Sequence, residues 1–446
     1  MQLSSPLRFF AFSENESSGK IKAVIYYLIL GYISSLFIKN SPVITNLFMS
    51  LIFFLSWGTV STRSYFQHCL RSKINFGLIL FFILQLIGVL FSTNSIDGMD
   101  VLRIRLPLLI LPIAFCLIDF EQRTWTKMLL FYAIITTIAS GAGFLYGSYK
   151  AMNEQDTGYL YNDNISDLIG KQAVYMGLYV SAAIFIIVDT LIHKKEPGQK
   201  LRFMLFCSLL WLVFISFMLA SKTSLISLVL ILLWQVLSLL IRKRKFMKSF
   251  LLVIGLAMGF VFISGVFPKT LNRFKGIAET RFRFDNRNPE NHFNAEYDEN
   301  KWNSTNTRMA LWQCGIEIWR KHPLLGTGIG DEKAELTEKY KEKQFWYALS
   351  TEKNLHNQYL DILVSMGLVG LFFFLFIFLV YPLKLFFEQK QSLAVSIFIG
   401  LGFCFFTENM LDRYQGEVLI AFILPVTAKV FDGKIATLAD FPGGTY

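Results

Sequence analysis

The chain has 446 residues, of which 54% are hydrophobic and only 17% are charged, and its mean hydropathy is +0.46. A soluble domain carries about 25% charged residues, so this composition excludes an ordinary globular protein and predicts a polytopic helical membrane protein. The net charge of +11 does not indicate nucleic-acid binding, because most basic residues lie in short loops between apolar runs, where they orient the protein in the membrane. The five cysteines contain no CxxC pair, which predicts neither a disulfide framework nor a zinc site.

Twelve apolar runs are candidate transmembrane helices. In chain order they are 22–38, 43–60, 74–91, 106–119, 124–147, 172–192, 201–220, 223–241, 250–267, 357–381, 392–407 and 416–431. The fourth, eleventh and twelfth runs are short, so we expect flanking residues to extend them or the segments to be partly re-entrant. The predicted fold is therefore an all-α membrane bundle of about 12 transmembrane helices.

The distribution of basic residues predicts the orientation of these spans. If the N-terminus is cytoplasmic, the short cytoplasmic loops carry about three times as many Lys and Arg residues as the short outer loops. We therefore expect both termini in the cytoplasm and one large, partly helical loop on the outer face. The predicted organisation is an N-terminal bundle of about nine spans (1–267), the outer loop (268–356), and a C-terminal bundle of about three spans with a short tail (357–446).

Two helices are predicted inside the long outer loop. The first covers about 308–321, with a cap at 306–307, and the proline that follows ends it. The glycine-rich segment 326–330 predicts a turn, and the second helix, highly charged, covers 331–343 with Asp331 as its cap.

Four basic residues lie near predicted membrane ends on the outer face: Arg103, Arg105, Lys222 and Arg308. A cation near a bilayer is energetically costly unless it is paired. Together, these four residues are suited to bind an anionic group such as a diphosphate. The alternative is that they extend toward the interface, and for Arg103 and Arg105 both interpretations stay open. Functional binding is favoured for Lys222, in a tight turn between two spans, and for Arg308, one helical turn before Trp312. Trp312, Asn357 and His322 are further candidates for binding the diphosphate or the glycan.

Two histidines of the outer loop are candidate general bases. His356 lies where the loop enters the tenth span, and His322 lies beside a proline at the end of the first loop helix. A histidine at a helix end is also a common hydrogen-bonding residue, and Asn357 can equally be a helix cap. Gly328, within the glycine-rich turn, could present backbone N–H groups to a phosphate, although a simple turn is the favoured interpretation.

Carboxylates are scarce where a metal-dependent transferase needs them. The predicted first outer loop, 39–42, contains no acidic pair to hold a divalent cation on a diphosphate. Glu408 and Asp412 occupy the last outer loop, where they could bind a polar acceptor, although a salt bridge to Arg413 is the favoured role. If a diphosphate is the leaving group, fixed Arg and Lys side chains must therefore stabilise it, with no metal and no cofactor.

The sequence resembles the O-antigen ligase and O-antigen polymerase superfamily at three places. Arg308 and Trp312, followed by the segment His-Pro-Leu-Leu-Gly-Thr-Gly at 322–328, resemble the outer-loop segment of that family. His356-Asn357 followed by Gly367 and Gly370 matches its histidine–asparagine and glycine pattern. The layout of about twelve spans, with one large outer loop before the tenth, is also similar.

The resemblance implies a metal-independent glycosyltransferase in the bacterial inner membrane, with its active site on the periplasmic face. It would transfer a glycan from undecaprenyl diphosphate to an acceptor, which is lipid A–core in the ligase members, with His356 as base and Arg308 holding the diphosphate. Family members usually have an arginine where this chain has Lys222, which keeps the charge but loses the planar fork. The glycines would let the tenth helix pack closely against a neighbouring helix. The alternatives are a glycan polymerase with similar chemistry, or a transporter that moves the lipid-linked sugar without making a bond.

Overall fold

The computed structural model describes residues 19–39, 42–59, 69–193, 198–242, 247, 280–290 and 301–439. Within these ranges the chain is helical and has no strand, as predicted. Seven helices are long and apolar enough to cross a membrane: Pro42–Thr59, Lys73–Leu90, Gln122–Glu154, Ala173–Ile192, Gln199–Leu219, Gln358–Glu388 and Tyr414–Phe431. The chain is therefore an all-α multi-pass membrane protein, but the predicted count of twelve spans is not confirmed.

The helices of the first part of the chain agree closely with the predicted runs, except for the helix Ser95–Arg105, which was not predicted. They are α2 (Gly19–Ser35), α3 (Pro42–Ser56), α5 (Lys73–Leu90), α6 (Ser95–Arg105), α7 (Pro107–Leu117), α8 (Gln122–Glu154), α10 (Ala173–His193), α11 (Gln199–Leu219) and α12 (Lys222–Arg242). The predicted span 250–267 lies outside the described residues. Every other predicted span overlaps a helix, because a long apolar run can satisfy its backbone groups in a bilayer only as a helix.

The fourth predicted span, 106–119, is too short to cross a bilayer by itself. Its helix α7 has 11 residues, which reach about 16 Å, whereas the hydrocarbon core is about 30 Å thick. The charged helix α6 leads directly into α7, so the expected extension by flanking residues is seen on the N-terminal side. Most of α7 is buried among α3, α5 and α21 (Tyr414–Ala439), which explains its apolar composition.

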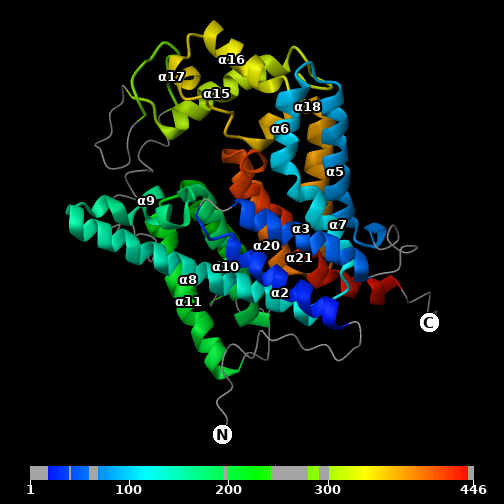
Figure 1. Cartoon of the computed structure of the whole chain (residues 1–446). Coiled ribbons are helices and arrows are strands. Elements are labelled where there is room, and N and C mark those ends of the chain that lie inside the picture. Colours follow the sequence, from blue (N-terminus) through cyan, green and yellow to red (C-terminus); the bar gives the residue numbers. More distant parts are fainter. Residues whose placement is uncertain are drawn as a thin grey trace.

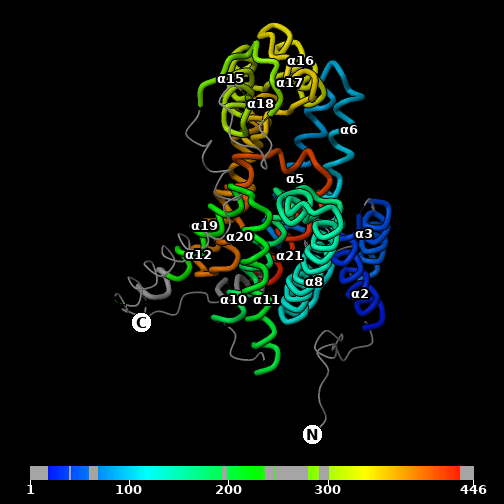
Figure 2. The backbone as a smooth tube through the Cα atoms, turned by 90° about the vertical axis from the view of Figure 1, so that its left-hand side faces the viewer, coloured from blue at the N-terminus to red at the C-terminus, as the bar shows by residue number. Residues whose placement is uncertain are grey.

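Part of the long loop forms a helical cap at one end of the molecule, above the bundle (Figures 1 and 2). The cap contains α15 (Ser304–Trp319), α16 (Glu332–Glu342) and α17 (Trp346–Ser350), which share a hydrophobic core with the start of α18 (Gln358–Leu375). Helix α15 begins four residues before the predicted start, because Asn303 and Asn306 form a reciprocal capping box at its N-terminus. The predicted three-part division of the chain stays a prediction.

The two glycine motifs meet in one structural unit. Gly367 interrupts α18 with φ of +66°, a left-handed conformation that favours glycine. The freed N–H groups of Leu368 and Val369 donate to the carbonyl oxygens of Pro323 (3.0 Å) and Leu324 (3.2 Å). A Cβ at Gly367 would lie 2.2 Å from the Leu324 oxygen. The expected close approach at this glycine is therefore made by the cap loop rather than by a neighbouring helix.

The remaining helices complete the bundle beside the cap. The chain continues from α18 through the π-helical segment Phe376–Val380 to α19 (Tyr381–Glu388), and then forms α20 (Ser392–Thr407) and α21. Thr223, at the start of α12, contacts Thr407 at the end of α20 (2.7 Å), whereas Ser392, at the other end of α20, contacts Asp189 near the end of α10 (3.0 Å). Alternate connections thus lie on opposite faces, as crossing helices require. Which face is cytoplasmic stays a prediction.

Candidate active site

His356 lies in the short segment that joins the cap to α18. Its backbone has φ of +47°, a left-handed conformation that costs a non-glycine residue about 1–3 kcal/mol and must be held by its surroundings. The Trp312 indole N–H donates to the Leu355 carbonyl (3.1 Å), and the Asn354 side chain accepts from the His356 N–H (3.2 Å). Asn357 caps α18 by accepting the Leu360 N–H (3.1 Å). Trp312 and Asn357 therefore position the histidine.

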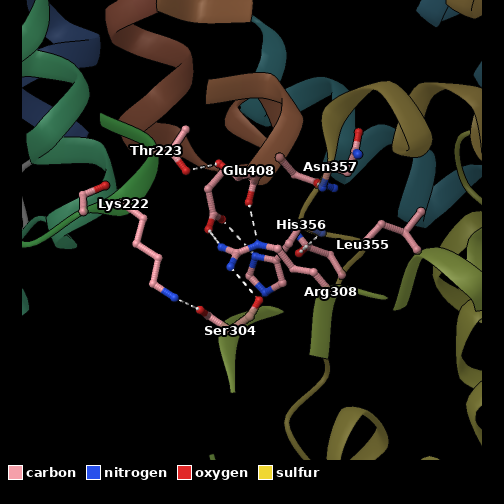
Figure 3. A network of polar contacts seen from close by, with 12 residues as sticks. Lys222, Thr223, Ser304, Arg308, Leu355, His356, Asn357 and Glu408 are labelled. Atoms are coloured by element: carbon pink, nitrogen blue, oxygen red, sulfur yellow. Dashed lines mark hydrogen bonds and ion pairs between the residues drawn. The ribbon is translucent and has the colours of Figure 1, made fainter. Parts of the chain in front are cut away.

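Glu408, in the connection after α20, joins the predicted base to the predicted arginine. Its Oε2 lies 2.9 Å from Nδ1 of His356, and its Oε1 accepts from Nη2 of Arg308 at 2.8 Å. Figure 3 shows the three side chains pointing toward one another from three separate segments of the chain. The side chains of Arg308 and His356 are 23% and 27% exposed, so a ligand can reach both.

Arg308 is fixed by main-chain oxygens as well as by the carboxylate. Its Nε donates to the Thr407 carbonyl (3.2 Å), and its Nη1 donates to the Ser304 carbonyl (2.8 Å) one turn earlier in α15. A guanidinium has five N–H donors, and these three bonds use three of them. Two donors remain for a ligand on a side chain that is already oriented.

Lys222 lies beside this arginine. Its ammonium donates to the Ser304 hydroxyl (2.8 Å), and Ser304 is also the residue whose carbonyl binds Arg308. The contact of Thr223 with Thr407 fastens the start of α12 to the end of α20 (Figure 3). Ser304 therefore contacts both Lys222 and Arg308, which come from helices far apart in the sequence.

The electrostatics of the cluster keep Glu408 ionised. Burial alone would raise the pKa of Glu408, but the hydrogen bonds and charges of His356 and Arg308 offset it and hold this pKa below its usual value. A carboxylate at 2.9 Å favours the imidazole tautomer that carries its proton on Nδ1. The Nε2 atom of neutral His356 then has its lone pair available to accept a proton.

Arg105 belongs to a second, buried network rather than to this cluster. Its guanidinium pairs with Asp412 and with Asp361 (3.4 Å), and only 3% of the side chain is exposed. Asn409 connects the two networks, because its side chain donates to both aspartates and accepts the Asn357 N–H at 2.7 Å. Arg105 is already neutralised by carboxylates, so the structure does not support its predicted role as a diphosphate ligand.

Arg103, His322 and Gly328 also lie outside the cluster. Arg103 is 78% exposed and pairs with Asp100 one turn earlier in α6. His322 is exposed and follows the C-terminal end of α15, whereas Arg308 lies in the second turn of that helix. The Gly328 N–H already donates to the Ser365 carbonyl (3.1 Å), so it is not available to a phosphate. The simple-turn interpretation of the glycine segment therefore fits the structure.

The expected salt bridge from the last outer loop to Arg413 is wrong. Glu408 pairs with Arg308 and His356, and Asp412 pairs with Arg105, whereas Arg413 is exposed. Sequence reasoning named Glu408 but assigned it to Arg413, its nearest cation in the sequence, whereas its partners lie 52 and 100 residues earlier in the chain. The available signal was an acidic residue directly after an apolar span, at the membrane depth where His356 was expected.

Glu332, the first residue of α16, gives a prediction about pH. Burial and the charge of Asp412 raise the pKa of Glu332 from 4.5 to about 8, despite the opposing effects of Asp361 and Arg105. The folded state therefore holds a proton that the unfolded state loses above about pH 4.5, so stability falls as the pH rises toward 8. In Glu332→Gln this loss is absent, and we expect its melting temperature to fall at least ~2 °C less than that of the wild type between pH 5.5 and 8.5.

The measurement is thermal unfolding of the purified protein across this pH range. Glu338→Gln, at an exposed position of the same helix, is the matched control and should follow the wild type. Parallel pH profiles for wild type and Glu332→Gln would show that Glu332 is ionised in both states.

One family model matches the chain over the segment that carries this cluster. The model described as O-Antigen ligase matches residues 207–375, less than half of the chain. The matched range contains Lys222, Arg308 and His356, whereas Glu408 lies beyond it. A search of curated proteins finds no match.

Proposed function

We propose that the chain is an O-antigen ligase-like enzyme, which the family match over residues 207–375 supports, and that it transfers a glycan from undecaprenyl diphosphate to an acceptor hydroxyl on the periplasmic face of the inner membrane. The acceptor we propose is lipid A–core, as in the ligase members of that family. The observation that carries the proposal is the convergence of His356 and Arg308 on the carboxylate of Glu408. A base and a fixed cation side by side suit a displacement in which a hydroxyl attacks and an anion leaves.

The attacking step uses His356. With Nδ1–H held by Glu408, Nε2 takes the proton of the acceptor hydroxyl as its oxygen forms a bond to the anomeric carbon of the donor sugar. The imidazolium that results is stabilised by the adjacent carboxylate. Attack from the face opposite the diphosphate inverts the anomeric configuration, and no covalent glycosyl intermediate is needed.

The departing step uses the cations. The bond from the anomeric carbon to the diphosphate oxygen breaks, and its electron pair leaves with the diphosphate. The two remaining donors of Arg308 and the ammonium of Lys222 stabilise the charge that develops there. Because these groups are fixed before substrate binds, the proposal requires no metal ion.

Arg308→Lys tests whether glycan transfer needs the planar, multi-donor guanidinium group as well as its positive charge. Lysine keeps the cation near Glu408 but cannot bind Ser304, Thr407 and a diphosphate together, so we expect kcat/KM to fall about 10- to 100-fold. The measurement is the initial rate of glycan transfer at equal amounts of membrane-inserted protein. Lys222→Arg, which restores the residue usual in the family, is the control and should keep wild-type activity. Full activity of Arg308→Lys would show that the guanidinium geometry is not required, only the positive charge.

The decisive experiment is transfer in vitro. Purified protein is mixed with undecaprenyl-diphosphate glycan and separate candidate acceptors, with and without a chelator of divalent cations. We expect a new glycosidic product and an equal rate in the presence of the chelator. Transfer to lipid A–core identifies a ligase, and transfer to a second lipid-linked glycan identifies a polymerase. Absence of any product, together with movement of the donor between leaflets once the protein is reconstituted in vesicles, would indicate a transporter and overturn the proposal.

A further inference from the structure

A cavity with a mixed polar and apolar lining lies at the ends of four helices, apart from the cluster around Glu408. Its volume is about 200 Å³, more than ten times the roughly 10–15 Å³ that a single water molecule requires. It is lined by the end of α2, the start of α3, the segment before α10 and the first turns of α21. The connection between α20 and α21 contains Glu408, so the cavity lies on the same face of the molecule as the proposed active site.

Lys171 lines this cavity as a buried cation that has no counter-ion among the described residues. The residue is 8% exposed, and its ammonium lies 4.8 Å from the centre of the Tyr179 ring. Among the described residues, no carboxylate lies within ion-pair distance of it. Two neighbouring lysines differ in this respect, because Lys39 and Lys150 both pair with Asp167. A buried charge normally has a partner, so a buried ammonium that lines a cavity is suited to bind an anion.

The protonation state of Lys171 is compatible with binding an anion. Burial lowers the pKa of this lysine to about 8, so it remains mostly charged at neutral pH. An anion in the cavity would stabilise the charged form further. The contact with the Tyr179 ring replaces only part of the hydration that the ammonium loses.

Gln415 adds a second recognition element to the same cavity. Its side-chain nitrogen donates to the Gly170 carbonyl (2.8 Å), whereas its buried oxygen has no hydrogen-bond partner among the described residues. A buried acceptor beside a buried cation suits a ligand with both an anionic oxygen and a hydroxyl group. Apolar side chains such as Leu36, Ile169 and Val418 form other walls of the cavity.

We propose that this cavity binds a phosphate group, with Lys171 as its cation, and that the phosphate belongs to a lipid headgroup that also carries a hydroxyl. The mixed polar and apolar lining at the membrane-proximal ends of the helices fits such a headgroup better than a free ion. This proposal does not depend on glycan transfer, because it concerns binding at a separate cavity.

The test measures binding to the purified full chain in detergent. The probes are short-chain phosphatidylglycerol, the diacylglycerol with the same acyl chains, and inorganic phosphate. Lys171→Met removes the charge and keeps the length of the side chain, and Lys150→Met is the matched control on a paired, less buried lysine. Lys171→Gln serves as a second neutral variant should the methionine disturb packing. The readouts are thermal stabilisation and lipid retention in native mass spectrometry.

We expect phosphatidylglycerol to bind wild type and Lys150→Met equally well. It should bind Lys171→Met about 10- to 100-fold more weakly, because one charge-assisted hydrogen bond is lost. Without lipid, Lys171→Met should melt at or above the wild-type temperature, because an unpaired buried charge has been removed. Competition by inorganic phosphate would identify free phosphate as a second source of the same chemistry. Equal binding of diacylglycerol, or unchanged phosphatidylglycerol binding in the Lys171 variants, would overturn the proposal.

Discussion

His356→Ala is expected to abolish glycan transfer while the protein accumulates normally in the membrane. The variant loses the atom proposed to take the proton of the acceptor hydroxyl, and general-base catalysis typically contributes 10²- to 10⁴-fold. The side chain lies at the surface of the cluster and is 27% exposed, so its removal leaves only a small gap. The measurement is the rate of product formation in the purified system, beside the amount of protein in the membrane fraction.

The matched control for this experiment is His322→Ala. Both histidines flank the cap, but His322 is exposed beyond the end of α15 and contacts none of the residues around Glu408. We expect this variant to transfer glycan at the wild-type rate. Near-normal transfer by His356→Ala would contradict the proposed base, and loss of transfer in His322→Ala would reopen the choice between the two histidines.

The helices were largely predictable from the sequence for a simple physical reason. In a bilayer, each backbone polar group must be bonded within its own segment, so long apolar runs specify helices almost without reference to the rest of the chain. The runs at 74–91 and 172–192 agree with α5 and α10 to within a residue or two. The prediction was weaker at 106–119, where burial inside the protein, rather than lipid, accounts for the apolar residues of α7.

The composition of the site was only partly predictable. His356, Arg308 and Lys222 were singled out as candidates because a cationic or imidazole side chain near the end of a membrane span is energetically costly unless it is paired. Arg105 has the same sequence signature, yet it pairs with two carboxylates that lie 256 and 307 residues later in the chain. Local sequence cannot distinguish a cation that meets substrate from one that meets a distant carboxylate. Glu408 was assigned incorrectly for the same reason, since its partners lie about 50 and 100 residues before it.

Glu408→Gln is the second variant with a large expected effect. The amide has no charge to stabilise the imidazolium of His356 or to balance Arg308, so we expect transfer to fall about 10²- to 10⁴-fold. The upper end of this range is the loss of about 10⁴-fold that follows when the acidic member of a catalytic triad is replaced by its amide. Because Glu408 acts through His356 and does not touch the reacting atoms in this proposal, it is a positioning residue. Its effect should depend on the presence of the histidine.

A double-variant cycle separates this role from a purely structural one. If Glu408 acts through the base, then the double variant His356→Ala, Glu408→Gln should transfer no more slowly than His356→Ala alone. Glu408→Asp keeps the charge on a shorter side chain and should recover part of the activity. Multiplied losses in the double variant would instead mean that the carboxylate contributes independently of the histidine, by holding Arg308 against the diphosphate. The rate of glycan transfer would then depend more on a correctly positioned Arg308 than on proton transfer to His356. In that case we would expect Arg308→Lys to lose more activity than His356→Ala.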